Sequence, residues 1–110
     1  MILRLLTIKT NNIEPLRAFY ELLGIHFTKE QHQDGPEHYY SLDMGLPVEI
    51  YPTNELIQNH IAISMSVVNA EEAKQVLISN GFTCSEIKQT KHGTYFVTRD
   101  PDDNRVEVYE

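Results

Sequence analysis

A chain of 110 residues has the length of one compact domain, so we expect a single domain over residues 1–110. Sixteen acidic and nine basic side chains give a net charge of −7, which opposes binding to nucleic acids and to anionic membranes. The largely apolar opening segment 1–6 is too short for a signal-peptide core or a membrane span and predicts a strand. The single cysteine, Cys84, cannot form an internal disulfide, which favours a reducing, cytoplasmic location.

The first half of the chain predicts a strand, a helix and three further strands. Asn11 and Asn12 can cap a helix, Pro15 is tolerated in its first turn, and Gly24 suits the position after its end. Between these signals, apolar side chains recur at steps of three and four residues. The expected elements are a strand at 2–9, a helix at about 13–23, and strands at 25–31, 38–43 and 47–51.

The second half repeats this order of elements. Asn69 and Glu72 form a capping-box pattern before a helix whose apolar face includes Val76, and Gly81 follows the end of that helix. The Asp100–Asn104 segment lacks the glycine of a calcium loop and predicts a turn. Strands are expected at 59–67, 82–88, 93–99 and 105–109.

The two halves indicate an internal duplication. Their last strands read Val-Glu-Ile-Tyr at 48–51 and Val-Glu-Val-Tyr at 106–109. The helix-ending glycines follow Leu5 by 19 positions and His60 by 21 positions. The alternative of two unrelated α+β stretches is disfavoured by the matched order of elements, so we predict an α+β fold of two βαβββ modules. The predicted modules cover residues about 1–52 and about 58–110.

Alternation along the strands predicts which side chains share one face. Glu49 and Glu107 point away from the apolar residues of the final strands, and His60 falls on the same face of a first strand. Two carboxylates on one surface repel each other unless a metal ion, a basic ligand group or a bound proton separates them. Imidazole and carboxylate groups suit zinc, nickel, iron or manganese, so these three residues are candidate metal ligands. The alternative for each is a solvated or hydrogen-bonded surface role.

The same concave face is expected to line a cavity for a small molecule. The predicted cavity residues are Leu5, Thr7, Tyr51, Ala62, Ser64 and Tyr109. Two further histidines, His32 and His38, flank a Gly-Pro turn. They either meet across a hairpin or stand as two exposed residues, and their spacing leaves both alternatives open.

Several segments resemble a known family. Leu-Arg-Ala-Phe-Tyr-Glu-Leu-Leu-Gly at 16–24, Asn-His-Ile-Ala-Ile at 59–63 and Asp-Pro-Asp-Asp-Asn-Arg-Val-Glu-Val at 100–108 resemble landmark stretches of the glyoxalase/bleomycin-resistance/dioxygenase (vicinal oxygen chelate) superfamily. Segment 27–39 resembles one seen in small single-domain members. The resemblance implies paired βαβββ modules whose curved mixed sheets surround a cavity, and it implies a homodimer for so short a chain.

The resemblance also implies a metal site. Family ligands come from the first and last strand of each module, which carries them over to Leu5, Glu49, His60 and Glu107. A leucine cannot bind a metal, so three ligands would hold a divalent zinc, nickel, manganese or iron ion. Glu49 or Glu107 would then act as the catalytic base of a lyase or dioxygenase.

Leu5 favours a second function instead, that of a glyoxalase-like protein which binds a small molecule without chemistry, as metal-free members of the superfamily do. A degenerate dimer with a structural or regulatory role is a third alternative. We expect small-molecule binding in the cavity. Whether the chain is an enzyme stays open, and the sequence identifies no ligand.

Overall fold

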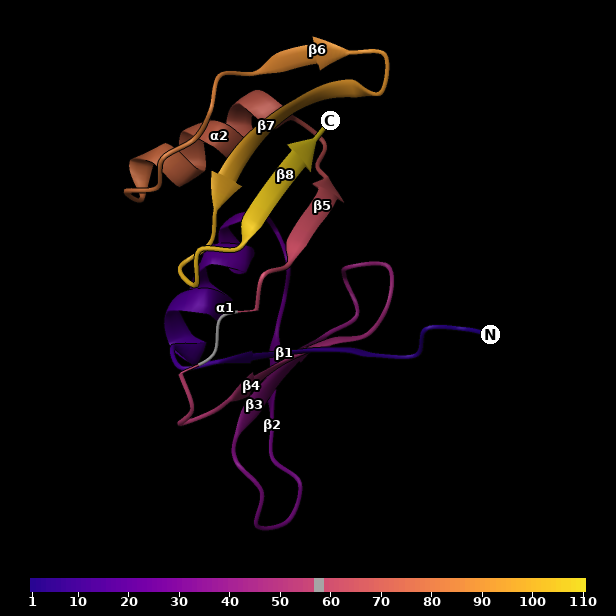
Figure 1. The fold of residues 1–110 in the computed structure, drawn as a ribbon, viewed down its shortest axis with the longest axis vertical. Coiled ribbons are helices and arrows are strands. Elements are labelled where there is room, and N and C mark those ends of the chain that lie inside the picture. The colour runs from indigo at the N-terminus through magenta and orange to yellow at the C-terminus, as the bar shows by residue number, and fades with distance from the viewer. Residues whose placement is uncertain (57–58) are drawn as a thin grey trace. The chain divides into compact units, whose positions relative to one another are not determined.

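The computed structural model describes residues 1–56 and 59–110, in two compact units, Met1–Asn59 and His60–Glu110, each with the element order βαβββ (Figure 1). The first unit contains β1 (Leu6–Thr10), α1 (Ile13–Leu22), β2 (Thr28–Glu30), β3 (His38–Ser41) and β4 (Val48–Pro52). The second unit contains β5 (Ala62–Ser66), α2 (Ala70–Ser79), β6 (Lys88–Thr90), β7 (Gly93–Arg99) and β8 (Arg105–Tyr109). The predicted α+β fold and its repeat are confirmed, while the predicted module start at residue 58 lies outside the described residues.

Each unit arranges its four strands in one mixed sheet. The strand order is β1-β4-β3-β2 in the first unit and β5-β8-β7-β6 in the second. In both sheets the first and last strands of the module are parallel neighbours, and the other neighbours are antiparallel. Side chains from the two ends of a module therefore lie side by side on one face, as the repeat predicted.

Both helices end two residues before the glycines that the sequence marks as helix-ending positions. Gly24 has a φ of 94° and Gly81 a φ of 90°, a left-handed conformation that favours glycine. Just after Gly24, the Ile25 N–H donates to the Tyr20 carbonyl at 3.3 Å, so this carbonyl at the end of α1 has a hydrogen-bond partner. The buried side chains of the helices are Leu16, Phe19 and Tyr20 in α1, and Ala70 and Leu77 in α2.

The hydrophobic core of each unit lies between its helix and the near face of its sheet. The buried sheet residues on these faces are Ile8, Tyr39, Val48 and Ile50 in the first unit, and Phe96, Val106 and Val108 in the second. The predicted alternation of the two final strands is therefore confirmed. Because those apolar residues face the helix, the glutamates and tyrosines between them face the other way.

Several predicted strands differ from the observed ones, since the strand expected at 2–9 begins only at Leu6 and the strand expected at 25–31 is reduced to β2. The predicted strand 59–67 begins only with β5, since His60 has a φ of 50°, outside the β region. The predicted strand 82–88 is not continuous. There the Ser85 hydroxyl accepts a hydrogen bond from the Val97 N–H at 2.8 Å, and β6 follows further along the chain.

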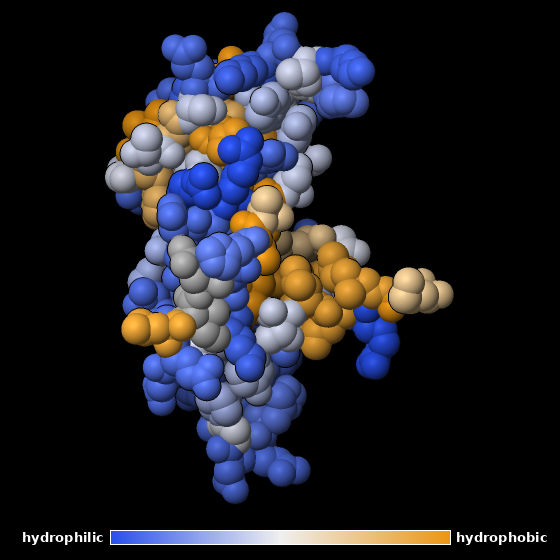
Figure 2. Space-filling model, viewed as in Figure 1, coloured by the Kyte–Doolittle hydropathy of each residue, from blue (hydrophilic) through white to orange (hydrophobic). Residues whose placement is uncertain are grey.

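The segment before β1 is apolar and exposed. Met1, Ile2 and Leu3 are all exposed, and Figure 2 shows a hydrophobic surface along the N-terminal part of the chain, whose end is marked in Figure 1. None of the helices in residues 1–56 and 59–110 has the length and apolar character needed to cross a membrane.

Candidate functional site

Each sheet has a polar face, which we define as the face opposite its helix. In the first unit this face carries Thr7, Lys9, His38, Tyr40, Glu49 and Tyr51. In the second unit it carries Ala62, Ser64, Tyr95, Val97, Arg105, Glu107 and Tyr109. The predicted site residues that lie in strands are therefore all on the polar faces.

Glu49 is held in place from the neighbouring first strand. It lies opposite Thr7 in the register of β1 and β4, and the Thr7 hydroxyl donates to Glu49 Oε1 at 2.8 Å. Its other oxygen, Oε2, is 3.8 Å from Nε2 of His38. The carboxylate is thus oriented by one strand and directed toward an imidazole on another.

His38 is a buried polar side chain with an unused nitrogen. Its side chain is 0% exposed, and its ring stacks on Tyr51 with centroids 4.3 Å apart and an interplanar angle of 23°. Nδ1 lies 3.2 Å from the Pro36 carbonyl oxygen. Nε2 has no hydrogen-bond partner within residues 1–56 and 59–110, although Glu30 Oε2 is only 3.5 Å away. Buried polar atoms rarely lack partners, so this nitrogen calls for a further group.

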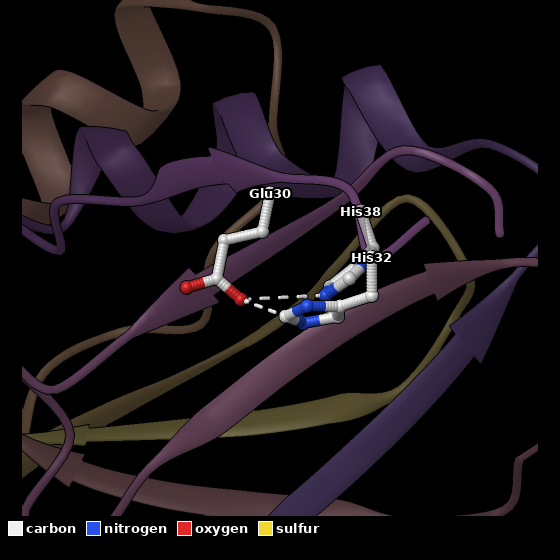
Figure 3. Close-up of side chains that lie close together, drawn as sticks. All are labelled: Glu30, His32 and His38. Atoms are coloured by element: carbon white, nitrogen blue, oxygen red, sulfur yellow. Dashed lines mark ion pairs between the residues drawn. The ribbon is translucent and has the colours of Figure 1, made fainter. Parts of the chain in front are cut away.

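Glu30, His32 and His38 form a cluster whose three ligand atoms lie within 4.8 Å of one another (Figure 3). The Glu30 carboxylate points toward both imidazoles, and its Oε2 is 3.4 Å from His32 Nε2. The two rings are 5.1 Å apart between centroids. Of the two alternatives for the histidines, the meeting across a hairpin is the one observed. Sequence reasoning missed Glu30, because His32 lies beyond the end of β2 and the shape of the turn brings the two side chains together.

Glu107 has a cationic partner within its own unit. Arg105 Nε lies 3.1 Å from Glu107 Oε2, and Ser64 is opposite this glutamate in the register. Beside them Tyr95 and Tyr109 stack with centroids 4.9 Å apart and an interplanar angle of 17°. The Arg105 guanidinium thus offsets the negative charge of Glu107, a role for which the sequence analysis had considered a metal ion, a basic ligand group or a bound proton.

A hollow of about 690 Å³ opens in the second unit, alongside β7 and the segment before β6. It is lined by Gly81, Phe82, Thr83, Cys84, Ser85, Lys88, Tyr95, Val97, Thr98, Arg99 and Arg105. This set contains none of the predicted cavity residues, whose role stays a prediction. Sequence reasoning missed the hollow because its wall comes from the irregular segment 82–88, which the sequence predicted as a plain strand.

The register also shows which residues of the two first strands occupy equivalent positions. Thr7 pairs with Glu49 as Ser64 pairs with Glu107, so Leu5 corresponds to Ala62 and not to His60. The exposed His60 stands two residues before that position. Ligation by Glu49, His60 and Glu107 involves both units and stays a prediction.

Sequence comparison alone finds no relatives, since no family model and no curated protein matches the chain. Comparison of structures finds several similar proteins. A glyoxylase/bleomycin resistance protein/dioxygenase domain from a Frankia species matches with a TM-score of 0.78 and 13% identity, over 99% of this chain and 96% of that chain. An antibiotic-binding protein from a Streptomyces species matches with a TM-score of 0.75 and 15% identity, over 99% and 94%.

A third similar structure is a bleomycin resistance determinant encoded on the transposon Tn5. It matches with a TM-score of 0.68 and 16% identity, over 100% of this chain and 98% of that chain. The chain therefore has the glyoxalase/bleomycin-resistance/dioxygenase fold. At such identities the likeness concerns the fold, and function has to be argued from the residues of this chain.

Proposed function

We propose that this protein binds a small molecule, as the antibiotic-binding protein with the same fold does by its description. The observation that carries the proposal is the hollow of the second unit. Its volume of about 690 Å³ falls within the range of roughly 300–1,000 Å³ that is usual for small-molecule pockets. It opens beside the stacked pair Tyr95 and Tyr109, which offers a flat aromatic surface.

The lining of the hollow indicates the chemistry of the ligand. Phe82, Tyr95 and Val97 provide apolar contact area, while Lys88 and Arg105 bring positive charge. In a chain of net charge −7, this is a local concentration of basic groups. We therefore propose an aromatic ligand that carries an anionic group, with its ring against Tyr95 and its charge near Arg105.

Binding of an aromatic sulfonate, 8-anilinonaphthalene-1-sulfonate, tests this proposal. The probe should bind the folded protein with one site and a rise in fluorescence. Arg105→Ala should weaken binding about tenfold, because a charge-assisted contact contributes roughly 1.5 kcal/mol. Lys91→Ala, which removes a charge from the turn after β6, is the matched control and should bind as the unmodified protein does. Absence of binding, or equal weakening by both variants, would contradict the proposal.

A metal-dependent lyase or dioxygenase is the second candidate function. It would use Glu49, His60 and Glu107 as ligands, with Glu49 or Glu107 as the base. The half-buried Glu49 carboxylate favours it, since Thr7 orients that group as a ligand or a base requires. The zinc titration of the His60→Ala variant, described in the next subsection, separates this candidate from a different metal site.

A further inference from the structure

The end of β2, the start of β3 and the turn between them carry three potential metal ligands, Glu30, His32 and His38, which have no part in the proposed ligand hollow. Glu30 is the last residue of β2, and His32 follows it in the turn, with its Nε2 3.4 Å from Glu30 Oε2. The chain then reverses sharply. The Gly35 N–H donates to the His32 carbonyl at 2.9 Å, and a Cβ at position 35 would lie only 3.0 Å from that oxygen. The reversal places His38 opposite Glu30 in the register.

The hydrogen bond to Pro36 defines which nitrogen of His38 carries the proton. A carbonyl oxygen can only accept, so the contact at 3.2 Å places the proton on Nδ1. In the neutral ring Nε2 then presents its lone pair to the cluster. Metal-ligating histidines show this pattern, in which one ring nitrogen donates to a carbonyl and the other binds the ion. Stacking on Tyr51 fixes the plane of the ring.

Nε2 of His38 lies close to two carboxylates. Nε2 lies 3.5 Å from Glu30 Oε2 and 3.8 Å from Glu49 Oε2, and the imidazole itself is 0% exposed while the two carboxylates are 32% and 18% exposed. A metal ion bound by the cluster would place a positive charge between these groups and give Nε2 of His38 a partner.

The donor spacing favours the metal ion. With metal–ligand bonds of about 2.0–2.1 Å, two donors of a tetrahedral site stand about 3.4 Å apart. Glu30 Oε2 is 3.4 Å from His32 Nε2 and 3.5 Å from His38 Nε2. All three ligand atoms lie within 4.8 Å of one another, and the 70% exposed side chain of His32 is free to turn and adjust its distance to a bound ion.

We propose that Glu30, His32 and His38 bind one divalent transition-metal ion, with zinc or ferrous iron as the ions whose ligand preferences match two imidazoles and a carboxylate. Three protein ligands leave a coordination position open. Glu49, oriented by Thr7, lies next to His38 and can accept a hydrogen bond from a water molecule in that position. The site lies wholly in the first unit, so it goes beyond the proposed ligand hollow of the second.

Zinc titration of the full chain, stripped of metal by dialysis against a chelator, tests the proposal. Competition with a chromogenic zinc chelator should show one ion bound per chain. His32→Ala, an exposed position whose change leaves the core intact, should lower the zinc affinity by at least about a hundredfold, since loss of a mere outer-shell partner already costs up to that factor. Glu30→Gln should weaken zinc binding as well. Cobalt in place of zinc should give the strong visible absorption of a tetrahedral site.

Two histidine controls make the result specific. His92→Ala removes an exposed imidazole of the second unit, and His60→Ala removes the histidine of the alternative site. Both variants should bind zinc as tightly as the unmodified protein. Failure of the unmodified protein to bind zinc would overturn the proposal. Loss of binding in His60→Ala together with full binding in His32→Ala would also overturn it, in favour of Glu49, His60 and Glu107.

Discussion

At the scale of single residues, Tyr39 shows how one side chain ties the sheet of the first unit to its helix. Its hydroxyl donates to Glu14 Oε1 at 2.6 Å, and the Arg17 guanidinium binds Glu14 and lies over the Tyr39 ring. The hydrogen bond from Tyr39, followed by those from Arg17, lowers the pKa of Glu14 below its ordinary value, and the same bond to Glu14 raises the pKa of Tyr39. The pair therefore stabilises the fold with Glu14 ionised.

Tyr39→Phe should lower the free energy of unfolding by about 1 kcal/mol at neutral pH, because it removes a hydrogen bond to a carboxylate. A lowered folded-state pKa gives a contribution that is complete above the ordinary pKa of 4.5 and is lost as the pH falls through the folded value. Urea unfolding should thus show a difference between the two proteins that is constant above pH 4.5 and shrinks below it. Tyr40→Phe is the control on the polar face, and an equal loss in both variants would refute the assignment.

For single residues, the sequence predicted the sheet face on which a side chain lies better than it predicted which side chains meet. Glu49 and Glu107 lie on the polar faces as alternation predicted, because alternation depends only on the local backbone. In the register Leu5 corresponds to Ala62, two residues after His60, a shift that matches the unequal spacings of 19 and 21 positions. The Glu30, His32 and His38 cluster could not be fixed in advance, since it depends on the exact shape of the turn that contains Gly35.

At the scale of elements, the two helices begin in different ways although both follow an asparagine. The Asn69 side chain accepts a hydrogen bond from the Glu72 N–H at 2.9 Å, which confirms the predicted cap of α2. Asn12 precedes α1 without a side-chain hydrogen bond of this kind. Its own N–H donates instead to the Thr10 hydroxyl at 2.9 Å. The same residue type thus caps one helix and not the other.

Asn69→Ala should therefore destabilise the protein by about 1 kcal/mol, the usual cost of a lost N-cap. Asn12→Ala is the matched control and should cost only a few tenths of that amount, because no capping bond is removed. Thermal unfolding of both variants, followed by circular dichroism, measures the difference. Equal shifts of the midpoint would show that the side-chain bond to Glu72 does not stabilise α2.

Elements with strong periodic or glycine signals were predicted closely, and the edge strands were not. The first helix was expected at about 13–23 and is found at Ile13–Leu22. The strand expected at 25–31 is observed only as β2. The His26 N–H donates to the Asp43 carboxylate at 2.8 Å, so it is not available for a hydrogen bond to a neighbouring strand. Such a side-chain partner 17 positions away leaves no local pattern in the sequence.

At the scale of the whole molecule, the exposed apolar segment before β1 is the main feature that the fold of one chain leaves uncovered. Ile2 and Leu3 are 85% and 68% exposed, and Figure 2 shows the surface they belong to as strongly hydrophobic. The segment continues into β1, which is an edge strand of its sheet. Apolar surface beside an open strand edge favours association with a second copy, so the predicted homodimer is retained as a proposal.

Light scattering measures this directly. The unmodified protein should have about twice the mass of the 12.7 kDa chain at micromolar concentration. Replacing Ile2 and Leu3 together by serine removes the apolar surface without touching the core, so the variant should dissociate to a monomer at concentrations where the original is dimeric. Leu42→Ser is the control, since Leu42 is equally exposed at 65% but lies in a turn after β3. A monomeric original would contradict the dimer. A dimer that survives loss of Ile2 and Leu3 would place the contact elsewhere, because the free energy of association then comes from surface other than this segment.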